Sequence, residues 1–113
     1  MPSALAVLDI SRLRRISDDD ESFLQELLDE LLQDTSQQIV MLLRAVEQAD
    51  LTTCARLAHK AKGSCASVGA DSLAALFNSV ERGASARDAK VCRTFAEHLF
   101  PELDKLRFEI THI

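Results

Sequence analysis

The segment whose residues could most clearly carry out chemistry is residues 57–70, LAHKAKGSCASVGA, in which small and apolar residues recur at helical spacing. His59 follows the apolar Ala58 by 100° around such a helix, so its ring should rest at the edge of the core with its tip in solvent. An exposed imidazole nitrogen can act as a nucleophile. Lys62, one turn later on the same face, could neutralise an anion attached to that ring.

Gly63 is the second unusual feature of this segment. A glycine in a helix interior costs about 1 kcal/mol relative to alanine. A helix-destabilising glycine beside a nucleophilic side chain suggests that another molecule must approach closely there. Two plainer interpretations stay open from the residues alone: a helix glycine often serves a packing contact, and a half-exposed histidine is often incidental.

Helices must position these residues. The chain has 113 residues, 47% of them hydrophobic, with three Gly and two Pro, which is typical of one all-helical domain. We expect an antiparallel up-down four-helix bundle with a short additional N-terminal helix, spanning residues 1–113, with residues 1–8 as a loose N-terminus. The apolar periodicity predicts helices over residues 9–16, 18–50, 51–68 and 71–82, and a last region from residue 86 that kinks or restarts at Pro101.

Several residues mark where these helices begin and end. Ser17 is expected to end the first helix and cap the second, and Asp50 is expected to cap the third. Gly69 and Gly83 are expected to close the third and fourth helices, because glycine is favoured just past a helix end.

Composition narrows the function classes. The formal net charge is −5 and there is no Tyr or Trp, which argues against nucleic-acid binding. Residues 1–50 hold 11 acidic and 4 basic side chains, whereas residues 51–93 hold 3 acidic and 7 basic ones, so an anion should be handled in the second stretch. No secretory signal or long apolar run is present, so we expect a cytoplasmic protein without membrane insertion.

The remaining candidate residues are weaker. The three cysteines, Cys54, Cys65 and Cys92, have no CxxC spacing, so neither a disulfide framework nor a zinc knuckle is expected, and Cys54 and Cys65 fit buried inert thiols. His98 and His112 lack Lys or Gly companions and are expected at the surface or boundary. No metal site and no bound cofactor are expected in this chain.

The same segment resembles the histidine-containing phosphotransfer (HPt) family, whose motif has the form H-x-x-K-G-[SA]-[SA]-x-x-[LVI]-G-A. The matching residues are His59, Lys62, Gly63, Ser64, Val68, Gly69 and Ala70. Cys65 stands where Ser or Ala is commoner in the family, and Ala61 stands where a larger apolar residue is usual. Both departures are conservative in size class. The resemblance extends over nearly the whole chain, including a GD-like turn at Ala49 and Asp50.

The resemblance implies that His59 Nε2 accepts a phosphoryl group from an aspartate of a receiver domain and passes it to another receiver aspartate in two-component signalling. It implies that Lys62 steadies the phosphoryl oxygens and that Gly63 gives access. Glu81, 22 residues after His59, matches a position where the family often has Gln or Glu that contacts the imidazole. A carboxylate there could accept a hydrogen bond from Nδ1–H and leave Nε2 free, although it would also favour the non-nucleophilic imidazolium.

The expected partners are receiver domains of response regulators or of a hybrid histidine kinase, which would bring the Mg²⁺ site. The expected docking rim around the histidine comprises Ala55, Arg56, Lys60 and Ala66, although a solvated helix face explains the two cations equally well. We expect a monomer.

Two rival interpretations of the histidine-bearing helix are possible. The phosphoacceptor domain of a sensor kinase typically has an acidic residue directly after its histidine and a nearby proline, whereas Lys60 follows His59 here. Because no Gly-rich ATP-binding segment is present, autonomous kinase activity is not expected. The second rival is a non-catalytic helical adaptor, against which the intact His59, Lys62 and Gly63 argue.

Overall fold

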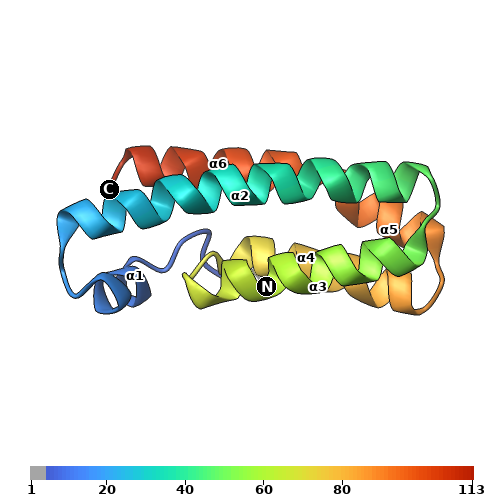
Figure 1. The fold of residues 1–113 in the computed structure, drawn as a ribbon, viewed down its shortest axis with the longest axis horizontal. Coiled ribbons are helices and arrows are strands. Elements are labelled where there is room, and N and C mark those ends of the chain that lie inside the picture. The colour runs from blue at the N-terminus through green and yellow to red at the C-terminus, as the bar shows by residue number, and fades with distance from the viewer. Residues whose placement is uncertain (1–4) are drawn as a thin grey trace.

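The computed structural model describes residues 5–113, and this part of the chain contains helices and no strands. The all-helical class predicted from the sequence is therefore confirmed. Figure 1 shows α2 and α6 along one long edge of the molecule and α3 with α4 along the other. The helices are α1 (Ile10–Ser17), α2 (Glu21–Glu47), α3 (Leu51–Ser67), α4 (Asp71–Ser85), α5 (Ala89–Ala96) and α6 (Leu99–Thr111).

Aspartates cap most of the helix starts. Asp50 caps α3 through the backbone N–H of Thr53, which confirms that prediction. The prediction that Ser17 caps the second helix is wrong, because Ser17 is a buried residue at the end of α1 and Asp20 caps α2. Asp18 and Asp19 take the left-handed conformation, with φ of 51° and 58°, so α2 begins at Glu21 rather than at residue 18.

The core lies between α2, α3, α4 and the last two helices. The helix α3 faces it with a regular row of small and apolar residues, whereas Val68, directly after the helix, is only partly buried. The buried residues of α3 are Leu51, Cys54, Leu57, Ala58, Ala61 and Cys65. This row fixes the rotation of α3 and so decides which of its side chains face solvent.

Gly83 does not end α4 as predicted. The helix continues to Ser85, and Gly83 is buried inside it against α5. A Cβ atom at this position would lie 2.8 Å from Val91 Cγ1 and 3.3 Å from Cys92 Sγ. The glycine is therefore required for close packing of α4 on α5, and a helix-end interpretation was wrong for that reason.

The last helical region restarts two residues before the predicted point. The helix α5 ends at Ala96 and α6 begins at Leu99, which places Pro101 within the first turn of α6. Proline is tolerated there because the N–H groups of a first helical turn have no partner within the helix.

The N-terminal segment is tied to the end of the histidine-bearing helix. Of the predicted loose residues 1–8, residues 1–4 lie outside the described part, and Ala6 O accepts a hydrogen bond from Ser72 N at the start of α4. Arg12 donates to Ala66 O at 2.7 Å and to both carboxylate oxygens of Asp71. These contacts join α1 to the turn between α3 and α4, where Gly69 has φ of +86° and closes α3 as predicted.

Candidate functional site

His59 lies on the outer face of α3, in the middle of the helix. Its side chain is 70% exposed, while the preceding Ala58 is fully buried. Nδ1 lies 2.9 Å from Glu81 Oε2, and within residues 5–113 no hydrogen bond reaches Nε2. One ring nitrogen is thus held by the protein and the other is open to a second molecule.

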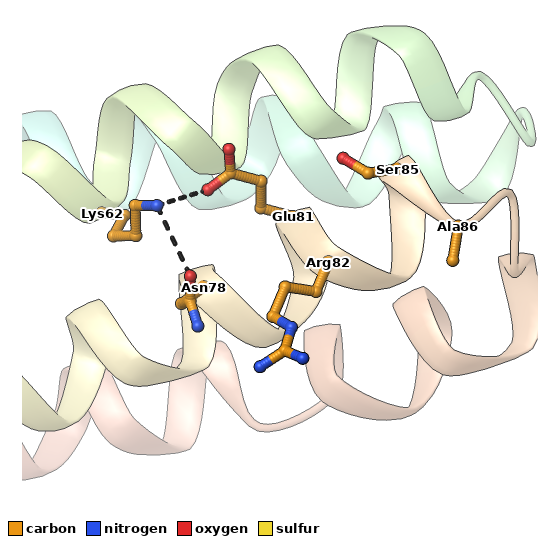
Figure 2. A pocket seen from close by; sticks show the side chains of 6 residues that line it. All are labelled: Lys62, Asn78, Glu81, Arg82, Ser85 and Ala86. Atoms are coloured by element: carbon orange, nitrogen blue, oxygen red, sulfur yellow. Dashed lines mark hydrogen bonds and ion pairs between the residues drawn. The ribbon is translucent and has the colours of Figure 1, made fainter.

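Glu81 comes from α4, which runs back beside α3 after the short turn that contains Gly69. Its two carboxylate oxygens serve different partners: Oε2 meets the imidazole, and Oε1 accepts a hydrogen bond from Lys62 Nζ at 2.6 Å. Figure 2 shows Lys62 reaching from α3 to Glu81 on α4. The structure therefore joins His59, Lys62 and Glu81 through a single carboxylate that is 22% exposed.

The hydrogen bond from Lys62 is the main cause that lowers the pKa of Glu81. Burial opposes it, and the hydrogen bond with His59 adds a smaller effect in the same direction as Lys62. Glu81 is thus ionised at neutral pH and can only accept a hydrogen bond. The neutral imidazole that suits this acceptor carries its proton on Nδ1, which leaves a lone pair on Nε2.

Asn78 is a neighbour that the sequence did not single out. Its Oδ1 lies 3.4 Å from Lys62 Nζ, and it lines an open depression together with Lys62, Glu81, Arg82, Ser85 and Ala86. In Figure 2, the guanidinium of Arg82 points away from the Lys62–Glu81 pair. The available signal was spacing, because Asn78 precedes Glu81 by three residues and so shares its face of α4.

Gly63 lies one turn after His59 and is exposed. A Cβ atom built at this position would meet no other heavy atom within 4 Å. Helix packing therefore does not explain this glycine. Open space lies beside the imidazole where a second molecule would have to approach.

The residues expected at the docking rim flank this open surface on α3. Arg56, Lys60 and Ala66 are exposed, and Ala55 is partly buried. Within the described chain, the Lys60 ammonium group makes no hydrogen bond or ion pair. Arg56 lies close enough to Asp50 to contribute to the lowered pKa of that carboxyl, after the hydrogen bonds from Thr53.

The other histidines and the cysteines lie apart from this site. His98 is exposed just before α6, and His112 forms a hydrogen bond with Phe108 O at the end of α6. Cys54, Cys65 and Cys92 are free and buried, and burial raises the pKa of Cys54 and of Cys65 to about 11. Among residues 5–113, no three or more His, Cys, Asp or Glu side chains gather closely enough to hold a metal ion. No described helix is both long enough and apolar enough to span a membrane.

Comparison with known proteins identifies the family. The Hpt domain model matches residues 26–107, which is most of the chain. The fold is similar to the crystal structure of histidine-containing phosphotransfer protein B (HptB) from Pseudomonas aeruginosa PAO1, with a TM-score of 0.88, 24% sequence identity, and coverage of 97% of this chain and 95% of that one. No curated protein sequence gives a significant match. The chain therefore belongs to the Hpt domain family and is a histidine phosphotransfer intermediate of two-component phosphorelays.

Proposed function

We propose that His59 is the residue that carries the phosphoryl group, and that it accepts this group at Nε2 from a receiver-domain aspartate and passes it to another. The supporting observation is the asymmetry of the ring: Glu81 holds Nδ1 at 2.9 Å, while the side chain is 70% exposed and Nε2 points to no partner within residues 5–113.

In the proposed step, the Nε2 lone pair attacks the phosphorus of the aspartyl phosphate, and the bond from phosphorus to the aspartate oxygen breaks. The aspartate leaves as a carboxylate, and the imidazole becomes a phosphorylated imidazolium that keeps its Nδ1 proton. Glu81 Oε2 faces that proton and stabilises the positive charge that develops on the ring. The second transfer is the reverse of this step, onto a different aspartate.

Lys62 and Gly63 have distinct proposed roles in this reaction. In the phosphorylated protein, Lys62 is the ammonium group that steadies the phosphoryl oxygens, for which it must leave Glu81 and Asn78. Gly63 keeps the approach to Nε2 clear, because its α-carbon faces open space.

We propose that the partners are receiver domains of response regulators or of a hybrid kinase, and that they supply the Mg²⁺. Phosphoryl transfer depends on positioning and charge neutralisation, which a metal on the receiver can provide. The exposed Arg56 and Lys60, with Ala55 and Ala66, form the proposed docking rim.

The finer points of organisation are also proposals. We propose a cytoplasmic monomer, formed as a single domain over residues 1–113. In the proposed antiparallel up-down bundle, α5 and α6 together form the fourth helix beside α2, α3 and α4, and α1 is the short additional one. The contacts of α2 with α3, α5 and α6, and of α4 with α3 and α5, support this arrangement.

Incubation with a phosphorylated receiver domain tests the function. Wild type should gain phosphate that is labile in acid and stable in alkali, and the His59→Gln variant should gain none while keeping its fold, because an exposed residue contributes little to the core. ATP alone should label neither protein. Labelling of His59→Gln by the receiver, or of wild type by ATP alone, would contradict the proposal.

A further inference from the structure

The Glu81 carboxylate has two opposing effects on the His59 ring. A lone carboxylate 2.9 Å from an imidazole favours the doubly protonated ring as well as the Nδ1–H form. The doubly protonated ring has no lone pair on Nε2, so it cannot attack phosphorus. Glu81 alone would therefore orient the nucleophile and suppress it at the same time.

The second carboxylate oxygen of Glu81, Oε1, is paired with a cation. Lys62 Nζ lies 2.6 Å from Glu81 Oε1, and Asn78 Oδ1 gives the ammonium group a second acceptor at 3.4 Å on the same helix as Glu81. Lys62 is about one-third exposed, so the ion pair is partly shielded from water. The net charge of the Lys62–Glu81 pair is zero, while Oε2 is still free to accept from the ring.

The remaining charges around His59 are cations without a contact to the ring. Arg56 and Lys60 on α3 are exposed, and in Figure 2 the guanidinium of Arg82 on α4 is turned away from the Lys62–Glu81 pair. None of the three forms a hydrogen bond with the ring. The helix α2, which packs on α3, contributes no side chain that bonds the imidazole. Lys62 is thus the cation in direct contact with the carboxylate that orients His59.

We infer that Lys62 is a positioning residue in the unphosphorylated protein: by neutralising Glu81, it lets the carboxylate orient the His59 ring through Nδ1–H without drawing a second proton onto Nε2. This inference rests on the proposed function of His59 and adds to it a role for Lys62 that precedes any contact with the phosphoryl group. The two roles of Lys62 differ in what they predict. A contact with the phosphoryl group changes the rate at every pH, whereas charge neutralisation changes the pH at which the ring becomes nucleophilic.

The first measurement needs no activity. The protonation of the His59 ring is followed by NMR against pH in unphosphorylated wild type, Lys62→Met and Lys62→Arg, with thermal melts to confirm that each is folded. In Lys62→Met, the transition from imidazolium to neutral ring should move to higher pH, because the Glu81 carboxylate is no longer neutralised. Lys62→Arg keeps the charge and should stay near wild type, and Lys90→Met, which removes an exposed cation on α5, should not move it.

The second measurement uses phosphoramidate, from which Nε2 displaces ammonia as the phosphorus–nitrogen bond breaks. The pH profile of the initial rate should move to higher pH in Lys62→Met by the same amount as the NMR transition. In the Glu81→Gln background no carboxylate remains to be neutralised, so adding Lys62→Met should leave the profile where Glu81→Gln puts it.

A lower rate at every pH in Lys62→Met, with no movement of either the profile or the NMR transition, would overturn the inference and leave Lys62 with the phosphoryl contact alone. An equal shift from Lys62→Met with and without Glu81 would overturn it too. Failure of wild type to react at His59 would instead contradict the proposed function, and the NMR transition would still decide the role of Lys62.

Discussion

Two glycines in neighbouring helices interrupt good helix-forming sequence for opposite reasons. Gly83 in α4 is buried, and a Cβ atom there would lie 2.8 Å from Val91 Cγ1. Gly63 in α3 is exposed, and a Cβ atom there would meet nothing within 4 Å. Both carry the same helix penalty of about 1 kcal/mol relative to alanine. At Gly83 the penalty is offset by close packing of α4 on α5. At Gly63 no packing contact within the described residues offsets it.

The contrast assigns separate tasks to the two surfaces. The α4–α5 interface, at Gly83, belongs to folding. The outer surface of α3 at Gly63, one turn after His59, has no role in folding that the described contacts reveal. A feature of the sequence that costs stability and contributes no packing marks the place where a partner is expected.

The largest effect should come from filling the packed position. Gly83→Leu should lower the free energy of unfolding by about 3 kcal/mol, because Val91 is β-branched and has little freedom to move aside. Denaturant titration measures this loss. Folded molecules of the variant should still accept phosphate on His59 at nearly the wild-type rate. A loss below about 0.5 kcal/mol would show that the α4–α5 contact is not tight and would break the comparison.

The next effect should appear at the open position, in transfer rather than in stability. Gly63→Gln should melt no lower than wild type, since Gln is a better helix former, and should accept phosphate from a receiver domain at least about tenfold more slowly. Phosphoramidate, which needs far less room than a receiver domain, should react with the variant at nearly the wild-type rate.

The comparison of the two phosphodonors, the receiver domain and phosphoramidate, separates a docking effect from a loss of reactivity at His59. Normal transfer from the receiver to Gly63→Gln would show that the glycine is not needed for docking. A marked loss of stability would instead assign Gly63 to packing, as for Gly83.

A smaller effect should come from Glu81, on the face of α4 that meets α3. Its pKa in the folded protein is lowered from an ordinary value of 4.5, so its ionised form stabilises the fold above that value and this contribution is lost as pH falls through the lowered pKa. Wild type should exceed Glu81→Gln in unfolding free energy by less than about 1 kcal/mol at pH 7, since the pair is partly exposed. The difference should shrink in acid, and a difference that is constant from pH 7 to pH 3 would contradict the ion pair.

The smallest effect should come from the least intrusive change. Gly63→Ala should raise the free energy of unfolding by up to about 1 kcal/mol, because the added methyl group improves helix propensity and meets no neighbour. Thermal and denaturant melts measure the gain. Gly83→Ala is the matched control and should lose stability, so equal signs for the two alanines would remove the distinction between the two glycines.

Local signals explain what the sequence could predict. The start of α3 at Asp50 and its end near Gly69 follow from a capping side chain and a left-handed glycine, and the exposure of His59 follows from its angle to the buried row. These features depend on residues within a few positions of one another. The contact of Glu81 with the ring was expected only through resemblance to a family.

Long-range packing explains what the sequence could not predict. Gly83 was predicted to end its helix, and only the position of α5 shows that it lies inside α4 as a packing glycine. The pairing of Lys62 with Glu81 and Asn78 depends on how α4 is rotated against α3. The restart of the last region at Leu99 depended on where the chain turns back onto the core, and Pro101 was only its nearest local marker.

The central claim is that one nitrogen, His59 Nε2, receives the phosphoryl group. Protein with ¹⁵N-labelled histidine, phosphorylated by a receiver domain and observed by ¹⁵N and ³¹P NMR, tests it directly, because the coupling identifies the nitrogen that bears phosphorus. The account predicts a single phosphorylated site at Nε2 of His59, with the proton kept on Nδ1 beside Glu81. Phosphorus on Nδ1 of His59, or on a ring nitrogen of His98 or His112, would contradict it.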